Sequence, residues 1–509
     1  MNKENNRLEN YGLTELPKGW ANCHIKDVAT VNPKKIEADP ELIAGFVPMS
    51  HAPTGLESKL AYEERTWGEI QKNYTNFKDG DVIFAKVTPC FENGKAAIVD
   101  GLPNGIGAGS SEFYVLRPNH QLVKNTIIFS LIKTFQFAQA GASSMTGAVG
   151  LRRVPRKFVE DYKFLLPPLA EQQEIARQLD TLLAQVEHTQ ARLQRIPDIL
   201  KRFRQSVLAD AVSGRLTEEW RATNKDNSYS AREFLENIEQ TRLNLIKSKQ
   251  LKKSVLPNIE IDYNSSALPH GWAVVKFEHI AAFTNNALKA GPFGSSLKKS
   301  DCTDSGYRVY GQEQVISGDE NLVTYYISES KFKELSSCAV TSDDILISLV
   351  GTIGKVLILS EFSEPGIINP RLVKLSLQPE VNRKYIQFYL QSLIALDFFK
   401  GFSHGGTMEI LNLGILKGLP INFPPLEEQT QIVARVEQLF AYADRIEQQA
   451  GAALERVNLL SQSILAKAFR GELTAQWRAE NPDLISGENS AEALLARIQA
   501  ERSTRKKGG

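Results

Sequence analysis

Two long segments of the chain repeat the same alternation of apolar and polar positions. In both, ten positions recur at alternating spacings of four and three residues, and only Thr189 among them is polar. The first set is Ile175, Leu179, Leu182, Val186, Thr189, Leu193, Ile196, Leu200, Phe203 and Val207, and the second is Ile432, Val436, Leu439, Ala443, Ile446, Ala450, Ala453, Val457, Leu460 and Ile464. A repeat of 3.5 residues keeps one narrow stripe facing a partner helix, which predicts two coiled-coil helices.

The residue sizes along the two stripes favour pairing of the helices with each other. Ala443, Ala450 and Ala453 would leave voids against a second alanine stripe, whereas the larger side chains of the first stripe would fill them. The alternative is that each helix only covers its own globular domain, but such helices show a wider apolar face with a 3.6-residue period. A helix over 175–207 would be roughly 50 Å long at about 1.5 Å per residue. Antiparallel pairing would carry the domains before the two helices to opposite ends and relate them by an approximate two-fold axis.

The ends of both segments are repeated and carry helix signals. Residues 167–222 and 424–479 align without a gap, and nineteen of the 56 positions are identical, far more than in the segments before them. Each copy opens with Pro-Pro and a glutamate in the first turn, and Gly214 and Gly471 lie where a C-terminal cap belongs. Pro197, whose counterpart is Leu454, removes a backbone hydrogen bond and predicts a bend in the first helix alone.

The segments before the two copies share only short patches. Both open with Leu-Pro-x-Gly-Trp, at 16–20 and 268–272, and both contain an apolar strand, at 80–87 and 343–350, followed by Gly-Lys and another strand. β-Branched runs and glycine turns predict mixed α+β folds dominated by sheet. We therefore divide the chain into a head (1–166), a repeated helix (167–222), a tail helix and linker (223–267), a second head (268–423), a second repeated helix (424–479), and a tail helix with a disordered basic end (480–509).

Composition narrows the class of protein. With 509 residues, 42% hydrophobic and 23% charged, the chain is typical of a globular protein of several domains. It lacks a run of about 18 apolar residues for a membrane helix, and its polar start lacks the apolar core of an export signal, so we expect a cytoplasmic location. The cysteines, Cys23, Cys90, Cys302 and Cys338, are spread singly, which disfavours a zinc or redox site.

Motifs for catalysis are missing from the sequence. It has no glycine-rich dinucleotide loop, no phosphate loop and no histidine pair at metal-ligand spacing. The run 351–356 indicates a tight turn, and 422–426 has the wrong order for the Asn/Asp-Pro-Pro-aromatic motif of adenine methyltransferases. A net charge of +1 does not indicate nucleic acid, and the basic run 152–157 is, on charge alone, typical of a solvated surface. Binding is thus favoured over catalysis.

Together these motifs resemble the specificity (S) subunit of type I restriction-modification enzymes. The Pro-Pro-Leu-x-Glu-Gln helix starts, the heptads, the Gly-x-Leu-Thr-x-x-Trp-Arg endings and the two heads carry the resemblance over the whole chain, and 199–205 and 463–474 look most like the K-type (type IA) family. The resemblance implies that each head reads one half of an asymmetric, bipartite double-stranded DNA target. The helices would set the spacer and dock two methyltransferase subunits for N6-adenine methylation, and restriction subunits would add ATP-dependent cleavage. S-adenosylmethionine, ATP and Mg would then belong to partner subunits, with no cofactor in this chain.

The resemblance also suggests contact residues. Two classes of recognition domain are similar to the heads, one to 84–95, 105–107 and 112–113 in the first head, and another to 291–298, 351–355 and 369–371 in the second. Amide and guanidinium groups read base edges, and lysines chiefly hold phosphates. The expected DNA-binding residues are Lys86, Thr88, Asn93, Lys95, Thr146, Arg152, Arg153 and Arg156, then Ser295, Ser296, Lys298, Gln312, Thr352, Lys355, Arg371 and Thr407. Trp220 and Trp477 are expected to anchor partner subunits, with packing on their own helix base as the alternative.

Two other functions are compatible with parts of this pattern. One is a single-chain fused methyltransferase and endonuclease, against which the missing methyltransferase motifs and the chain length argue. The other is a coiled-coil assembly scaffold that does not bind DNA.

Overall fold

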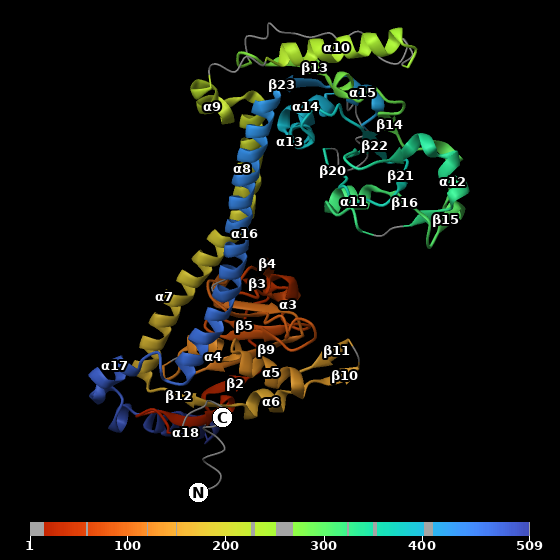
Figure 1. The fold of residues 1–509 in the computed structure, drawn as a ribbon. Coiled ribbons are helices and arrows are strands. Elements are labelled where there is room, and N and C mark those ends of the chain that lie inside the picture. Colours follow the sequence, from red (N-terminus) through yellow and green to blue (C-terminus); the bar gives the residue numbers. More distant parts are fainter. Residues whose placement is uncertain are drawn as a thin grey trace. The chain divides into compact units, whose positions relative to one another are not determined.

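The chain folds into two compact units, seen here in a computed structural model that describes residues 15–56, 60–119, 121–148, 150–224, 230–250, 268–322, 325–349, 354–401 and 411–507. The first unit combines Met1–Arg195 with Ala450–Gly509, and the second is Ile196–Gln449 (Figure 1). Each unit therefore holds one head and a part of both repeated helices.

The first head contains an antiparallel sheet and a mixed sheet that pack on each other. In the described residues, one sheet has the strand order β2-β9-β6-β7 and the other β4-β3-β8-β5; Phe77 and Ile83, one from each sheet, share a buried cluster. The first and last strands, β1 and β12, pair, and β10 and β11 form a hairpin. The strands are β1 (Ala21–His24), β2 (Ala29–Val31), β3 (Ile43–Val47), β4 (Glu63–Thr66), β5 (Thr75–Lys78), β6 (Val82–Ala85), β7 (Ala96–Ile98), β8 (Ile106–Gly109), β9 (Phe113–Pro118), β10 (Thr146–Ala148), β11 (Leu151–Arg153) and β12 (Lys163–Leu166). The helices are α2 (Ile25–Val28), α3 (Trp67–Ile70), α4 (Asn125–Ile132), α5 (Phe135–Ser144) and α6 (Arg156–Asp161).

The second head repeats this strand connectivity with a different sequence. Its described sheets have the orders β14-β22-β19-β20 and β15-β17-β16-β21-β18, and β13 pairs with β23. The strands are β13 (Ala273–Lys276), β14 (Leu288–Ala290), β15 (Cys302–Thr303), β16 (Tyr307–Tyr310), β17 (Tyr326–Ile327), β18 (Ala339–Val340), β19 (Ile345–Ser348), β20 (Val356–Ile358), β21 (Gly366–Ile368), β22 (Leu372–Leu375) and β23 (Pro420–Phe423). The helices are α11 (Gln312–Ser317), α12 (Glu329–Glu334), α13 (Arg383–Gln391), α14 (Leu393–Lys400) and α15 (Leu413–Lys417).

Each head has a parallel strand pair at the same place in this order, β3 with β8 and β16 with β21. A glycine lies in both pairs: a Cβ on Gly107 would come within 2.6 Å of the Gly45 carbonyl oxygen, and one on Gly366 within 2.1 Å of the Arg308 carbonyl oxygen. The predicted central strands are β6 and β19, each paired antiparallel with the strand that follows Gly-Lys. The sheet-rich α+β heads expected from the sequence are confirmed.

The first repeated segment forms two helices, and the second forms one. α7 spans Leu169–Gln194 and α8 spans Ile196–Ser213, whereas α16 runs unbroken over Leu426–Phe469. At the interruption the Arg195 amide donates to the Arg192 carbonyl at 3.2 Å, and Pro197 has no amide to donate. The first helix is therefore interrupted beside Pro197, and its counterpart Leu454 lies inside a continuous helix.

Within each unit the two helical segments run antiparallel. The hydrogen-bonded pairs are Gln190 with Asn458 and Thr474 with Glu171 in the first unit, and Arg204 with Asp444 and Thr217 with Glu428 in the second. Residue numbers rise along one segment while they fall along the other, so the pairing is antiparallel in both units, as expected.

The buried stripe is wider at the helix ends than the predicted seam. Leu183, Leu208, Val433 and Leu465 are buried one position beside it, because the helix ends also pack on the heads. Leu460, predicted in the seam, is 47% exposed. A strict seam is thus wrong at these positions. Packing of a helix on its own head, the alternative, is present for Leu183 and Val433, whereas Leu208 and Leu465 pack on the head that precedes the other helix.

Tail helices follow both copies. After short helices α9 (Glu218–Thr223) and α17 (Ala475–Glu480) come α10 (Ala231–Lys247) and α18 (Ala491–Lys507). Because α18 extends through Lys507, the basic run from Arg502 is helical there rather than the disordered end expected from the sequence; the Arg502 guanidinium donates to the Lys26 carbonyl. The expected disordered linker falls largely on 251–267, outside the described residues.

Candidate nucleic-acid interface

Several predicted contact residues of the first head lie close together where the segment that directly follows β6 bonds to the β10–β11 hairpin. The Thr88 amide donates to the Arg152 carbonyl at 3.0 Å, and the Thr88 hydroxyl accepts from the Arg152 amide at 3.0 Å and donates to the Gly150 carbonyl at 3.2 Å. The Val154 amide donates to the Lys86 carbonyl at 2.8 Å. These bonds and the hairpin register bring together the residues that we call the hairpin surface: Lys86, Thr88, Thr146, Arg152 and Arg153.

The arginines of this region are paired with carboxylates to different degrees. Arg153 makes three bonds of 3.2, 2.9 and 2.6 Å to Glu112, and this hydrogen bonding is the main cause that lowers the pKa of Glu112. Arg156 pairs with Glu160 at 2.7 Å. Arg152 lies 3.7 Å from the Glu92 carboxylate and is 48% exposed, so it is the arginine held least tightly.

Asn93 and Lys95 lie in the loop 88–95, between β6 and β7, which we call the reading loop. The Phe91 amide donates to the Val87 carbonyl at 2.9 Å and the Asn93 amide to the Pro89 carbonyl at 2.9 Å, so the loop forms a helical turn. Asn93 is exposed, whereas the Lys95 ammonium donates to the Met49 carbonyl at 2.7 Å. Glu92 of the same loop faces Arg152, and the reading loop therefore adjoins the hairpin surface.

Two predicted residues of the second head bond to each other. Arg371 Nη1 donates to Gln312 Oε1 at 3.3 Å, and Gln312 Nε2 donates to the Ser348 hydroxyl at 2.8 Å. Gln312 is only 8% exposed, whereas Arg371 is exposed. Gln312 thus orients Arg371 and has little surface of its own for a ligand, a role that the sequence did not indicate.

The other predicted residues of the second head flank this pair. A Cβ on Gly291 would lie 1.9 Å from the Asn369 carbonyl oxygen, so a glycine there lets the segment after β14 run beside Asn369. That segment contains Ser295 in the short 3-10 helix Gly294–Ser296, followed by exposed Lys298. Ser296 and Lys355 are also exposed, and Thr352 and Thr407 lie outside the described residues.

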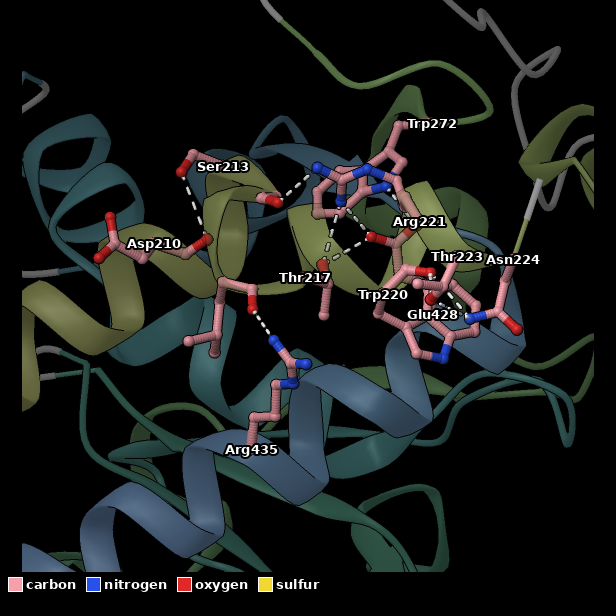
Figure 2. Close-up of polar contacts among 12 residues, drawn as sticks. Asp210, Ser213, Thr217, Trp220, Arg221, Thr223, Asn224, Trp272, Glu428 and Arg435 are labelled. Atoms are coloured by element: carbon pink, nitrogen blue, oxygen red, sulfur yellow. Dashed lines mark hydrogen bonds and ion pairs between the residues drawn. The ribbon is translucent and has the colours of Figure 1, made fainter.

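A buried carboxylate joins the second head to both helical segments of its unit. Trp272 Nε1 donates to Glu428 Oε2 at 2.8 Å, and the Thr217 hydroxyl donates to Glu428 Oε1 at 2.6 Å (Figure 2). Arg221 forms an ion pair with the same carboxylate and donates to the Gly214 carbonyl at 2.7 Å. Glu428 is 2% exposed, and we call this cluster the second arm junction.

The first unit contains the same junction built from the repeated counterparts. Trp20 Nε1 donates to Glu171 Oε2 at 2.8 Å, the Thr474 hydroxyl donates to Oε1 at 2.6 Å, and Arg478 forms the ion pair. Glu171 is fully buried. Local pattern predicted only a helix-start role for these glutamates. Each is nevertheless identical between the copies, and its bonding partners all come from the other repeated motifs.

The capping glycines have a second role in the junctions. Gly214 and Gly471 adopt positive φ values of 82° and 72°, as predicted for C-terminal caps. A Cβ on Gly214 would also come within 2.4 Å of Pro269, and one on Gly471 within 2.8 Å of Pro17. Each helix end therefore packs against the Leu-Pro-x-Gly-Trp opening of a head.

Trp220 and Trp477 do not bond to the buried carboxylates. They lie on α9 and α17 and are half-buried. The Trp220 carbonyl accepts a bond of 2.8 Å from Asn224 (Figure 2), and the Trp477 carbonyl accepts one of 2.8 Å from Asn481. Partial burial fits both a partner anchor and packing on the helix base, so the role of these tryptophans stays a prediction. Among the described residues, no group of His, Cys, Asp or Glu could hold a metal ion, and no helix is long and apolar enough to span a membrane.

Two sheet-rich heads with unlike polar surfaces, each tied to helices by a buried carboxylate, define a two-headed binding protein. The sequence profile of the type I restriction modification DNA specificity domain matches residues 17–198 and 269–456, and the chain belongs to this family of specificity subunits. Such subunits are the non-catalytic, DNA-sequence-recognition components of type I restriction-modification complexes, which confirms the family and the absence of catalysis expected from the motifs.

Individual relatives agree with this assignment. The EcoKI specificity subunit of Escherichia coli strain K12 is 32% identical and covers 96% of this chain and 97% of the relative. The EcoBI specificity subunit of Escherichia coli is 39% identical over 70% of this chain and 68% of the relative. The crystal structure of the HsdS subunit from Thermoanaerobacter tengcongensis has a TM-score of 0.57 at 18% identity and covers 91% of this chain and all of that one, a likeness of fold.

Proposed function

We propose that this specificity subunit reads an asymmetric, bipartite double-stranded DNA target, with one half assigned to each head. The observation that carries the proposal is that the heads share a strand order but present different polar groups. The first presents the hairpin surface and the reading loop, and the second presents Arg371 supported by Gln312. Different donors and acceptors on equivalent scaffolds read different bases.

The helices set the length of the spacer between the half-sites and dock two methyltransferase subunits for N6-adenine methylation. The length of α16, Leu426–Phe469, supports a spacing role, and the half-buried Trp220 and Trp477 are the proposed anchors. Replacing Trp477 with alanine should weaken assembly with the methyltransferase subunit in a co-purification experiment. Unchanged assembly with both tryptophans replaced would leave only the packing role.

Restriction subunits complete the complex and cleave unmodified DNA with ATP. S-adenosylmethionine, ATP and Mg belong to the partner subunits, and the complex works in the cytoplasm. The motifs of the chain support this division, since none of them matches a methyltransferase or nucleotide site. A fused single-chain enzyme is disfavoured for the same reason.

Exchange of one head tests the bipartite reading. Residues 268–423 are replaced by the second head of a relative with another target, and methylated adenines in host DNA are mapped by sequencing. We expect one half of the target to change and the other to stay. Changes in both halves would contradict the proposal, and no specific DNA binding by the assembled complex would favour the scaffold function instead.

A further inference from the structure

Lys133 connects the reading loop of the first head to a neighbouring loop from within the protein. It follows α4, and its ammonium donates to the Gly94 carbonyl at 2.6 Å and to the Thr54 carbonyl at 2.7 Å. Gly94 lies between Asn93 and Lys95, two of the residues expected to contact DNA. Lys133 is half-buried, and burial lowers its pKa to about 8. Both bonds go to backbone carbonyls, so they hold the main chain of the two loops in place and do not pair with a charged side chain.

The backbone around Lys133 is in turn held by a helix of the same unit. Gln462 of α16 donates from Nε2 to the Lys133 carbonyl at 3.1 Å and accepts from the Phe135 amide at 2.8 Å. The amide side chain of Gln462 thus bonds to both sides of the turn between α4 and α5. The connection runs from α16 through Gln462 and Lys133 to the Gly94 carbonyl.

Direct packing does not fill the space between the reading loop and the helices. A cavity of about 430 Å³ lies there, with Asn93 and Lys95 on the loop side and Gln190 and Gln462 on the helix side. Lys133 also lines it. A loop that borders a cavity has fewer van der Waals contacts to hold it, so polar bridges carry more of its positioning.

We propose that Lys133, held by Gln462, is a positioning residue that fixes the reading loop for recognition of the first half-site. This rests on the proposed function, because it assigns the loop to one half of a bipartite target. Lys133 itself does not contact DNA. The second head has Gln391, and not a lysine, at the matching position before the next helix.

The test uses the complex of the full chain with its methyltransferase partner and a duplex carrying the mapped methylation target. Binding is measured for the target and for duplexes with one base pair changed in either half. Lys133→Met keeps the apolar stem and removes both bonds, so we expect discrimination in the first half to fall about tenfold, as the loss of one or two hydrogen bonds would give. Discrimination in the second half of the target should not change. Lys133→Arg should keep most of the discrimination in the first half.

Three further measurements separate positioning from other roles. Gln462→Ala should reduce the same discrimination, and the double variant should be no worse than Lys133→Met, because both act through one connection. The salt dependence of affinity should be unchanged, whereas loss of a phosphate contact would lower the slope by about 0.9. Lys384→Met is the matched control: it breaks an exposed ion pair between the second head and Glu437 of α16 and should leave both halves read normally.

Wild-type discrimination in Lys133→Met, a lower salt slope, or equal loss in both halves would overturn the inference. If Lys133→Met does not fold, Gln462→Ala and Lys133→Arg decide by the same criteria. A wild-type complex that reads neither half would instead refute the proposed function, so the two failures are distinguishable.

Discussion

The heads and the arm junctions each occur twice in this protein, and they differ in what is repeated. The junctions repeat side chains, since tryptophan, glutamate, threonine and arginine make the same bonds in both. The distance from the tryptophan Nε1 to the glutamate Oε2 is 2.8 Å in each junction. The heads repeat a strand order and only short sequence patches. Their bonded polar pairs differ, since the Arg152 amide meets Thr88 in one and the Arg371 side chain meets Gln312 in the other.

The physical reason lies in what each region must satisfy. A buried carboxylate is costly unless charge and hydrogen bonds compensate it, so its partners are restricted to a few residue types at fixed positions. A sheet needs only apolar residues on its buried face, and its exposed loops accept many side chains. Sequence identity therefore collects in the junctions, and the variation that specificity needs collects in the heads.

The strongest test of the difference between the junctions and the heads is to remove each buried glutamate. Glu171→Ala and Glu428→Ala each leave a mostly buried arginine, Arg478 or Arg221, without its carboxylate. We expect both to lower the free energy of unfolding by about 3–5 kcal/mol, measured by denaturant titration. Glu472→Ala, which breaks an exposed pair with Arg470, is the control and should cost about 1 kcal/mol or less. A large loss in only one junction would show that the two are not equivalent.

A smaller effect is expected from the arginines of the hairpin surface. Arg152→Ala should weaken DNA binding and lower the slope of log affinity against log salt by about 0.9, because this arginine is exposed and only loosely paired with Glu92, so a phosphate can take the place of the carboxylate. Arg177→Ala, an exposed arginine of α7 paired with Glu174, should change neither quantity. Filter binding over a range of salt measures both. If Arg152→Ala behaves like Arg177→Ala, the hairpin surface is an ordinary solvated charge run.

A third effect concerns pH and separates the two heads. Burial lowers the pKa of Lys133 from 10.5 to about 8, so between these values the folded chain binds fewer protons than the unfolded chain. The free energy of unfolding of the wild type, relative to Lys133→Met, should therefore rise with pH in this window and stay level below it. Gln391→Met in the second head should show no such trend. Melting temperatures at pH 7 and pH 10 provide the measurement, and a falling difference would contradict it.

The sequence predicted features that depend on local pattern. Helix ends, capping glycines and the interruption at Pro197 follow from residue types at short spacing, and they are present. It did not predict the role of Glu171, whose partners Thr474 and Arg478 lie about 300 residues away, nor the exposure of Leu460. Burial of a helix face depends on what packs beside it, and periodicity alone does not contain that information.

The same limit applies to the site. Lys86, Thr88, Arg152 and Arg153 are each expected from the resemblance to contact DNA, and the structure gives them bonds to one another or to a common hairpin. Gln312 was expected at the DNA and is buried under Arg371. Which exposed side chains touch bases depends on the ligand, and the predicted DNA contacts stay predictions.

The composition of the first unit has a consequence for synthesis on the ribosome. Residues 196–449 are contiguous, so the second unit has all of its sequence before the first one does. Glu171 is separated from Arg478 by 307 positions, which at about 5–20 residues per second is a delay of roughly 15–60 s. During that interval the nascent first head holds the Glu171 carboxylate without Thr474 and Arg478, and an apolar helix face without the helical segment that covers it.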